Sequence, residues 1–325
     1  MKFFTVSFAA ALAVGACATL VKRSTKKDAL PPLSPVVLKD LEQRTDYKIF
    51  NNDLGLIRRF QEAVDSPDPV RRGAALSGLQ TTCTVDSCLA LTFDDGPYLY
   101  HKDIRQQFID AGLKTTFFVN GNNYRCIYDD QQAKAILHSV KAGMQIAAHS
   151  WSHPHLIGLT TDELRKQVYL LEDALWRIGG VVPSFIRLPY GETNDTITQF
   201  LNDQGYVVVT WSDNANSGDG DGESADYSIN VFKQLKAPEQ ALALQHETKE
   251  PTAHQVVPAE LKIVFENGYK KENIMTVAES FNLNPYKVVG TPGSRDEHWT
   301  CAGTPAPGDA DAQSTKTNIV AAESD

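Results

Sequence analysis

The sequence has little positive charge and, after its first residues, no long apolar run. Its 325 residues include 31 Lys and Arg against 40 Asp and Glu, which gives a formal net charge of −9. This acidic balance argues against a nucleic-acid partner, because phosphate backbones are bound by clustered Lys and Arg. No stretch beyond residue 18 is apolar enough for a transmembrane helix, so we expect no membrane anchor.

Cysteine is also scarce. The chain has five cysteines, at positions 17, 83, 88, 126 and 301. If Cys17 is removed with a leader, the remaining four can form two disulfides, with three possible connectivities. Their spacing does not match a zinc-finger pattern, so we interpret them as structural cross-links.

Two familiar site patterns are missing as well. No Gly-x-Ser-x-Gly occurs, so the sequence has no serine nucleophile elbow. The acidic residues Asp219, Asp221 and Glu223 do not follow the spacing of an EF-hand. We interpret them as a flexible acidic loop rather than a calcium site.

The first 18 residues have the parts of a secretory signal peptide. Lys2 precedes an apolar run from Phe3 to Val14, and Ala16-Cys17-Ala18 forms a cleavage site of the A-x-A type. The same region resembles a bacterial lipobox, which would instead lipidate Cys17. A signal peptide predicts a secreted, extracellular protein. Association with the cell wall is compatible with this prediction.

The composition divides the rest of the chain into three parts. Residues 19–82 are Pro- and Lys-rich at first and then weakly helical, which indicates a pro-segment or an N-terminal extension packed on the main domain. Residues 83–302 form the main domain. Residues 303–325 are rich in small and polar residues and are predicted to be a disordered tail.

Strand and helix patterns alternate through the main domain. Apolar runs typical of strands occur at residues 89–93, 115–119, 145–148, 185–188, 206–211 and 241–245. Helical patterns close at Gly112 and Gly143, and the clearest helix starts at a capping box of Thr160 and Glu163. This alternation predicts an α/β fold with a parallel sheet and outer helices.

Polar clusters follow four of the predicted strands. They are Asp94-Asp95, His149-Ser150-Trp151-Ser152-His153, Arg187-Leu188-Pro189-Tyr190-Gly191 and His246-Glu247. In parallel α/β folds, active sites collect at the carboxyl ends of the strands. The coincidence therefore predicts one site built from all four clusters.

Three of these residues have the chemistry of a metal site. His149 and His153 are four residues apart and would share one face of a helical turn, and Asp95 would add an anionic ligand. Two histidines and one carboxylate leave positions open for water. Because neighbouring side chains of an extended segment point to opposite sides, we expect Asp94 to have a different function from Asp95.

Taken together, the motifs resemble a known family. TFDDGP, HSWSH, RLPYG and LQHE occur in the order and spacing of the polysaccharide deacetylases with the NodB homology domain, carbohydrate esterase family 4. The resemblance covers residues 84–285 and extends to fungal chitin deacetylases. It implies a distorted (β/α) barrel of about seven parallel strands with outer helices, and it makes residues 83–302 a catalytic domain.

The resemblance also implies site residues. Asp95, His149 and His153 would hold a divalent metal, with zinc as the default and cobalt as an alternative. Asp94 would be the general base, and Arg187 would orient it and balance its charge.

Three further residues would complete the reaction. The backbone N–H of Tyr190 would stabilise the oxyanion, His246 would protonate the leaving amine, and Leu244 would contact the acetyl methyl. The implied reaction is hydrolysis of an N-acetyl group from a glucosamine polymer, without an acyl-enzyme intermediate.

The sequence departs from the family in one segment. An Asp-x-x-Asp-Trp pattern that tunes the arginine and packs on the acid histidine is usual after the strand ending at Trp211. Here Asp213 or Asn214 would take the first acidic position, and the tryptophan is missing. His246 is followed by Glu247 where the family usually has Asp.

The sequence is compatible with three hypotheses about function. The leading hypothesis is a secreted, monomeric chitin or chitooligosaccharide deacetylase whose partner is the polysaccharide. A second hypothesis changes the polymer to acetylated xylan or peptidoglycan, and a third is a wall-binding protein with attenuated activity. The remaining histidines (101, 138, 155, 254 and 298) are predicted to be surface residues.

Overall fold

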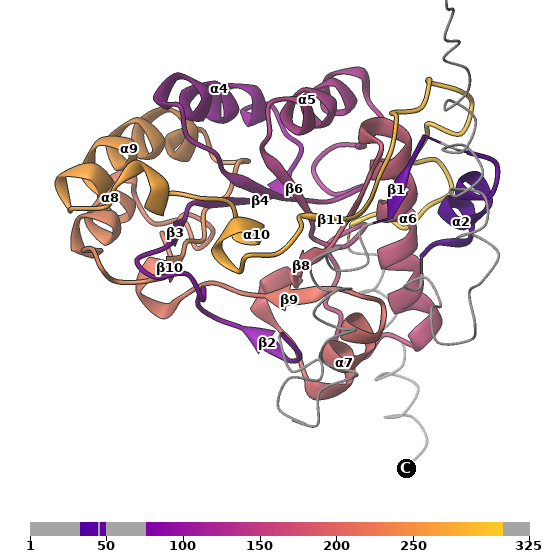
Figure 1. Ribbon diagram of the computed structural model, residues 1–325, viewed down its shortest axis with the longest axis horizontal. Helices are drawn as coiled ribbons and strands as arrows, with labels where there is room; N and C mark the ends of the chain where they lie inside the picture. The colour runs from indigo at the N-terminus through magenta and orange to yellow at the C-terminus, as the bar shows by residue number, and fades with distance from the viewer. Residues whose placement is uncertain (1–32, 45, 50–75, 308–325) are drawn as a thin grey trace, which may run out of the picture. The chain divides into compact units, whose positions relative to one another are not determined.

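A six-stranded parallel sheet forms the centre of the fold (Figure 1), with the strand order β2-β9-β8-β6-β5-β4. The computed structural model describes residues 33–44, 46–49 and 76–307, which lie in a structural unit beginning at Pro32. The strands are β2 (Leu79–Gln80), β4 (Thr92–Gly96), β5 (Thr116–Val119), β6 (Gln145–Ala148), β8 (Phe185–Arg187) and β9 (Val207–Val209). Every residue of β4, β5, β6, β8 and β9 is buried, as expected where helices cover both faces of a parallel sheet.

A second parallel pair curves this sheet toward a barrel. β3 (Leu89–Ala90) pairs with β10 (Ala241–Leu242), and isolated parallel bridges then join Asp94 to His246 and Asn216 to Leu244. The segment that carries β10 therefore lies between β4 and the chain that follows β9. No continuous ladder closes the described strands into a full barrel. The predicted fold, a distorted barrel of about seven parallel strands with outer helices, is confirmed.

Helices lie around these strands (Figure 1). They are α4 (His101–Ala111), α5 (Asp130–Lys141), α6 (Thr161–Gly179), α7 (Asp195–Asp203), α8 (Ala225–Gln234), α9 (Val257–Glu266) and the short α10 (Val277–Ser280). In helix α6, particular residues determine where the helix begins and ends. Thr160 and Glu163 form the predicted capping box, and the C-cap Gly180 takes a positive φ of 67°.

A small antiparallel sheet and an N-terminal helix were not predicted. The sheet order is β1 (Lys48–Ile49), β11 (Tyr286–Val289) and β7 (Val181–Pro183). Beside it, α2 (Pro35–Leu41) contributes to a small apolar core made of Leu33, Val37, Leu41, Trp176, Val182 and Val288. The part of residues 19–82 around α2 is therefore packed on the main domain, through α6.

Other predictions lie outside the described residues. These are the signal peptide or lipobox of residues 1–18, the weakly helical part of residues 19–82 (Leu54–Val64), and residues 308–325 of the predicted tail. The first residues of that predicted tail, 303–307, are described, and Thr304 and Pro305 accept hydrogen bonds from Trp151. The four remaining cysteines do form two disulfides, and the structure selects one of the three connectivities, Cys83–Cys88 with Cys126–Cys301. Among the described helices, none has the length and apolar character needed to cross a bilayer.

The four predicted polar clusters all lie in or after the carboxyl-terminal part of strands, at one end of the barrel: Asp94 and Asp95 are within β4, and Arg187 is the last residue of β8. Within β4 the register against β5 shifts between Asp94 and Gly96, and Asp95 takes a positive φ of 72°. Positive φ is rare for a residue other than glycine and is typical of functional sites. The shift sends the two adjacent carboxylates to different partners.

Candidate active site

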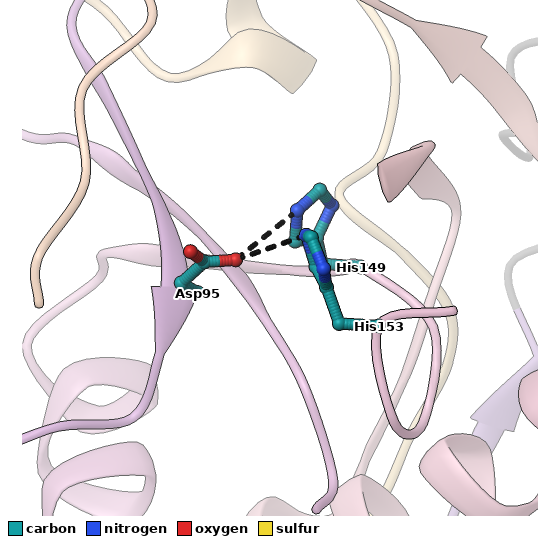
Figure 2. A group of neighbouring side chains, drawn as sticks. All are labelled: Asp95, His149 and His153. Carbon is teal, nitrogen blue, oxygen red and sulfur yellow. Dashed lines mark ion pairs between the residues drawn. The ribbon is translucent and has the colours of Figure 1, made fainter. Parts of the chain in front are cut away.

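Asp95, near the end of β4, and His149 and His153, from the loop after β6, form a compact group (Figure 2). Oδ1 of Asp95 lies 3.5 Å from Nε2 of His149 and 3.2 Å from Nε2 of His153. One ligand atom from each of the three residues lies within 4.8 Å of the others. Two imidazole nitrogens and one carboxylate oxygen are typical ligands of a divalent transition metal.

The two histidines reach this group from a loop, so the predicted helical turn was wrong. Residues 149–153 are not helical, and Ser150 and His153 have positive φ values of 67° and 56°. The side-chain amide of Asn120, which follows β5, donates hydrogen bonds to the carbonyls of His149 and Ser150. These bonds to a neighbouring loop replace the internal hydrogen bonds that a helical turn would form.

The charge states of the group suit a cation. Burial alone would raise the pKa of Asp95, but contact with His149 and the charge of the nearby histidines lower it well below its ordinary range. Burial lowers the pKa of His153 to about 4, so its ring is neutral and able to bind a metal at neutral pH. His149 donates from Nδ1 to the carbonyl of Arg187 at 2.8 Å, which leaves Nε2 toward Asp95.

One orphaned atom gives a direct test of whether a metal fits. Oδ1 of Asp95 is buried, and within the described part of the chain it has no well-aligned hydrogen-bond partner. Such an atom is costly to bury unless a ligand satisfies it. A cation bound by the two Nε2 atoms and this oxygen would supply the missing partner, so the residues present fit a divalent metal.

Asp94 is held by a buried arginine, and its other oxygen lies 3.9 Å from Nε2 of His149. Nη1 of Arg187 donates to Oδ1 of Asp94 at 2.8 Å and to Oγ1 of Thr92 at 2.7 Å. The guanidinium is fully buried and lies 4.2 Å from the centre of the Phe118 ring. Because burial lowers the pKa of Arg187 while the Asp94 charge raises it, each charge compensates the other.

His246 is paired with Asp219 behind the site. Nδ1 of His246 donates to Oδ1 of Asp219 at 2.7 Å. Burial would lower the pKa of His246, but the hydrogen bond and charge of Asp219 raise it to about 9. The imidazole is therefore protonated at neutral pH.

The sequence interpretation of this acidic segment was wrong. Asp219 is buried and bonded to His246, whereas Asp213 and Asn214 are exposed, with Asn214 bonded to Glu239. The missed signal is spacing: Asn216-Ser217-Gly218-Asp219 fits Asp-x-x-Asp with asparagine in the first position. Asp221 and Glu223 are exposed, as expected for surface loop residues.

Gly220 stands where that alignment would place the tryptophan of the family pattern. A Cβ at this position would lie 2.6 Å from Cε1 of His246. The His246 ring thus packs directly on the Gly220 backbone, without the wall that a bulky side chain would form.

Tyr190 and Leu244 lie on two further edges of the site. The Tyr190 ring is 4.7 Å from the ring of His153, half of the tyrosine is exposed, and its backbone has a φ of 60°. Leu244 is 6% exposed and is held by a backbone hydrogen bond to Ala215. Tyr190 therefore lies on the segment that follows Arg187, and Leu244 lies on the segment that carries His246.

His101 was predicted to be a surface residue, and this was wrong. It is fully buried between Glu247 and Ser139, with its two ring nitrogens 2.7 Å from Oε2 and Oγ respectively. Glu247 also accepts the N–H of Tyr98 at 2.7 Å. The glutamate after His246 therefore fastens the His246 segment to the turn after β4. The described histidines 138, 155, 254 and 298 are exposed, as predicted.

These features define a polysaccharide deacetylase, and the comparisons with known proteins agree. The sequence model of the family described as polysaccharide deacetylase matches residues 81–209. The chain belongs to this family, whose NodB-type, carbohydrate esterase family 4 members include fungal chitin deacetylases.

Individual relatives are similar over most of the described chain. A chitin deacetylase from Pestalotiopsis sp. is 33% identical over 252 residues, which cover 76% of this chain and 82% of the relative. A peptidoglycan-N-acetylglucosamine deacetylase from Bacillus cereus is 31% identical and covers 60% and 69%. The solved chitin deacetylase of Colletotrichum lindemuthianum shares the fold, with a TM-score of 0.61, 24% identity, and coverage of 69% and 99%.

Proposed function

We propose that the chain is a secreted, metal-dependent deacetylase that hydrolyses N-acetyl groups of chitin or chitooligosaccharides to chitosan and acetate. One observation carries the proposal: a metal-ligand group, a carboxylate held by a buried arginine and a protonated histidine held by a buried aspartate meet at one end of the barrel. The similarity to a chitin deacetylase supports the choice of polymer. The predicted signal peptide and the two disulfides support secretion.

A metal held by Asp95, His149 and His153, with zinc expected and cobalt an alternative, would lower the pKa of a water molecule and polarise the acetyl carbonyl. Asp94 acts as the general base that takes a proton from the attacking water. Its Oδ2 lies 3.9 Å from Nε2 of His149, beside the ligand group. Arg187 holds the other oxygen, which fixes the orientation of the base.

His246 acts as the general acid when the C–N bond breaks. It carries a proton at neutral pH because Asp219 raises its pKa, and it gives that proton to the leaving nitrogen. The backbone N–H of Tyr190 stabilises the charge that develops on the carbonyl oxygen. Leu244 is the apolar neighbour expected for the acetyl methyl.

Peptidoglycan is a second candidate polymer, favoured by the similarity to the Bacillus cereus enzyme. Acetylated xylan would use the same residues with an ester in place of the amide. The sequence argument for an attenuated wall-binding protein was the altered segment after Trp211. Asp219 supplies the carboxylate in that segment, so an enzyme is favoured.

Acetate release tests the proposal directly. The secreted protein is chelated, given zinc or cobalt, and incubated in parallel with chitin oligomers, peptidoglycan and acetylated xylan. We expect acetate from the chitin oligomers, lost on chelation and regained with metal. Acetate from another polymer alone would reassign the substrate, and none from any polymer with metal bound would contradict an enzymatic function.

A further inference from the structure

Glu247 follows the acid histidine in the sequence, and its side chain lies against the end of β4. The residue is fully buried, and Oε1 accepts the backbone N–H of Tyr98 at 2.7 Å. A Cβ added to Gly96, the last residue of β4, would lie 2.1 Å from both Cδ and Oε1 of Glu247. Only glycine therefore leaves room for this carboxyl group next to the strand.

Backbone hydrogen bonds join the same two segments. The N–H of Asp94 donates to the carbonyl of Gln245 at 2.8 Å, and the N–H of Glu247 donates to the carbonyl of Asp94 at 3.2 Å. These two bonds hold His246, which lies between Gln245 and Glu247, beside the strand that carries the base. The side-chain bond from Glu247 to Tyr98 adds a third connection at the far end of the turn after β4.

His101, the first residue of α4, holds the second oxygen of the Glu247 carboxyl group. Nδ1 of His101 lies 2.7 Å from Oε2 of Glu247, and Nε2 lies 2.7 Å from Oγ of Ser139 in α5. Because a carboxylate oxygen accepts hydrogen bonds, Nδ1 donates to it and Nε2 is left to accept the serine hydroxyl. The Phe117 ring stacks on the imidazole, with centroids 4.0 Å apart. Both oxygens of Glu247 are therefore occupied, and the side chain has one orientation.

Ser139, His101 and Glu247 also have the connectivity of a hydrolytic triad. All three residues are 0% exposed, so no substrate reaches the serine hydroxyl. The same hydrogen bonds instead connect α4 and α5 to the segment that carries His246. This arrangement is suited to positioning and not to nucleophilic catalysis.

We propose that Glu247 is a positioning residue of the reaction: it fixes the general acid His246 at a set distance from the general base Asp94. The inference rests on the proposed function, in which the acid and the base act on the same amide. Glu247 is buried and does not touch the substrate, so it acts on the alignment of the proton donor with the leaving nitrogen. His101 contributes through Glu247, because it holds the second carboxyl oxygen.

A second buried glutamate provides a matched control for a purely structural role. Glu172 of α6 is also fully buried, and it accepts the backbone N–H of Ser34 at 3.0 Å and a hydrogen bond from Nζ of Lys287 at 2.8 Å. Ser34 caps α2 and Lys287 belongs to β11, so these contacts join the N-terminal helix to the small antiparallel sheet. Replacing Glu172 should therefore reduce stability without changing the alignment of His246 and Asp94.

Kinetics on chitin oligomers at saturating zinc test the assignment. We compare the wild type, Glu247→Ala, Glu247→Asp and Glu172→Ala at a temperature at which urea unfolding shows that each is folded. Glu247→Ala should lose roughly 10- to 100-fold in kcat, with KM changed by less than about threefold. Glu247→Asp keeps the carboxyl group but is one methylene shorter, so it should lose roughly tenfold in kcat, and it replaces the alanine variant if that one does not fold. Glu172→Ala should keep the wild-type kcat.

The pH profile distinguishes positioning from tuning. Asp219 contacts the His246 ring and raises its pKa to about 9, and Glu247→Ala leaves this contact in place. The alkaline limb of kcat/KM should therefore stay at the wild-type pH while the plateau falls. An unchanged kcat in both Glu247 variants, an equal loss in Glu172→Ala, or a shifted alkaline limb would overturn the assignment.

Hydrogen exchange makes a further decision that does not depend on turnover. The amide hydrogens at positions 94 and 247 form the bonds between the two segments, so both should exchange at least about tenfold faster in Glu247→Ala, but not in Glu172→Ala. If the wild type releases no acetate, the proposed function fails. Faster exchange at these two amides would then still support Glu247 as the residue that holds the segments together, and unchanged exchange would reject it.

Discussion

Nδ1 of His246 donates a 2.7 Å hydrogen bond to Oδ1 of Asp219, and this contact sets the charge of the imidazole. The other oxygen of Asp219 accepts the N–H of His246 at 2.8 Å and the hydroxyl of Thr252 at 2.6 Å. Both oxygens are therefore occupied and the carboxylate has one orientation. Although burial would raise the pKa of Asp219, His246 lowers it, so both partners are charged at neutral pH.

Replacing this carboxylate should shift the pH dependence of the reaction. A general acid must be protonated, so activity is lost as the pH rises through the pKa of His246, about 9 in the wild type. Asp219→Asn removes the charge that raises this pKa while burial still lowers it. We expect the alkaline limb of kcat/KM to move to lower pH, with a loss of roughly 10- to 100-fold near neutrality.

Asp213→Asn is the control, because Asp213 is exposed and was the alternative acidic position in the sequence. Its pH profile should match that of the wild type. An unchanged alkaline limb in Asp219→Asn would show that His246 does not act as the acid, or that Asp219 does not tune it.

Most strands of the parallel sheet could be predicted from the sequence, but several end at other residues than expected, β2 was missed, and the loops beyond the strands could not be predicted. Apolar runs bounded by glycine identified most strands of the parallel sheet. Because Asp94 and Arg187 lie in the last residues of their strands, the strands also set the positions of these two side chains. His149 and His153 were also found, although the loop conformation was not. Positive φ at Ser150 and His153 depends on hydrogen bonds from Asn120, a contact between loops that local spacing does not contain.

Asp219 was missed for the same reason. Its segment has the composition of a solvated loop, rich in glycine and acidic residues, and only the tertiary contact with His246 shows that it is buried. His101 was similarly judged by its polarity alone. Its partner Glu247 is 146 residues away, so the sequence offers no local sign of the pair. The β1-β11-β7 sheet joins short segments from distant parts of the chain and was also invisible locally.

Replacing Asp94 by asparagine and replacing Asp95 by asparagine should have different effects on metal affinity and on acetate release. Asp94 contacts Arg187, whereas Asp95 contacts the two histidines, so the losses should differ in kind. Asp94→Asn should bind metal as the wild type does but lose roughly 100- to 10,000-fold in acetate release. Asp95→Asn should lose metal affinity by more than about 100-fold, beyond the effect usual for residues that only support a ligand.

Metal affinity by competition with a chelating dye, and acetate release at saturating metal, distinguish the two variants. Each serves as the control for the other, because they are neighbours with the same substitution. If both lost metal affinity equally, Asp94 would be a ligand and the assignment of the base would be wrong.

The Cys126–Cys301 disulfide should support the metal-ligand loop as well as global stability. It holds the C-terminal segment where Nε1 of Trp151 donates to Thr304 at 3.0 Å and to the carbonyl of Pro305 at 3.1 Å. Trp151 lies in the loop that carries both ligand histidines. Replacing both cysteines by serine should therefore weaken metal binding, together with a stability loss of up to about 5 kcal/mol for so long a loop.

The matched control replaces both Cys83 and Cys88 by serine. The disulfide that is lost in this variant closes a loop with a sequence separation of only 5. The same chain-entropy argument gives about 2 kcal/mol for this short loop. Its metal affinity should be unchanged. Equal metal affinities in the two double variants, measured below their unfolding temperatures, would limit the Cys126–Cys301 bond to a global role.

Glu260 should make the protein less stable as the pH rises. This residue of α9 is fully buried, and neither oxygen of its carboxyl group has a well-aligned partner among the residues described. Burial, assisted by the charge of Asp219, raises the pKa of Glu260 from 4.5 to about 8. Between these values the folded state keeps a proton that the unfolded state has released, so the free energy of unfolding falls as the pH rises.

Glu260→Gln removes this titration and preserves the shape of the neutral side chain. The variant should gain stability over the wild type with increasing pH, by up to about 3 kcal/mol between about pH 5 and about pH 8. Urea unfolding at several pH values measures this difference, and the other titrating groups cancel because they are common to both proteins. A difference that does not change with pH would show that Glu260 is already ionised in the folded state, with a partner such as a buried water that stabilises its charge.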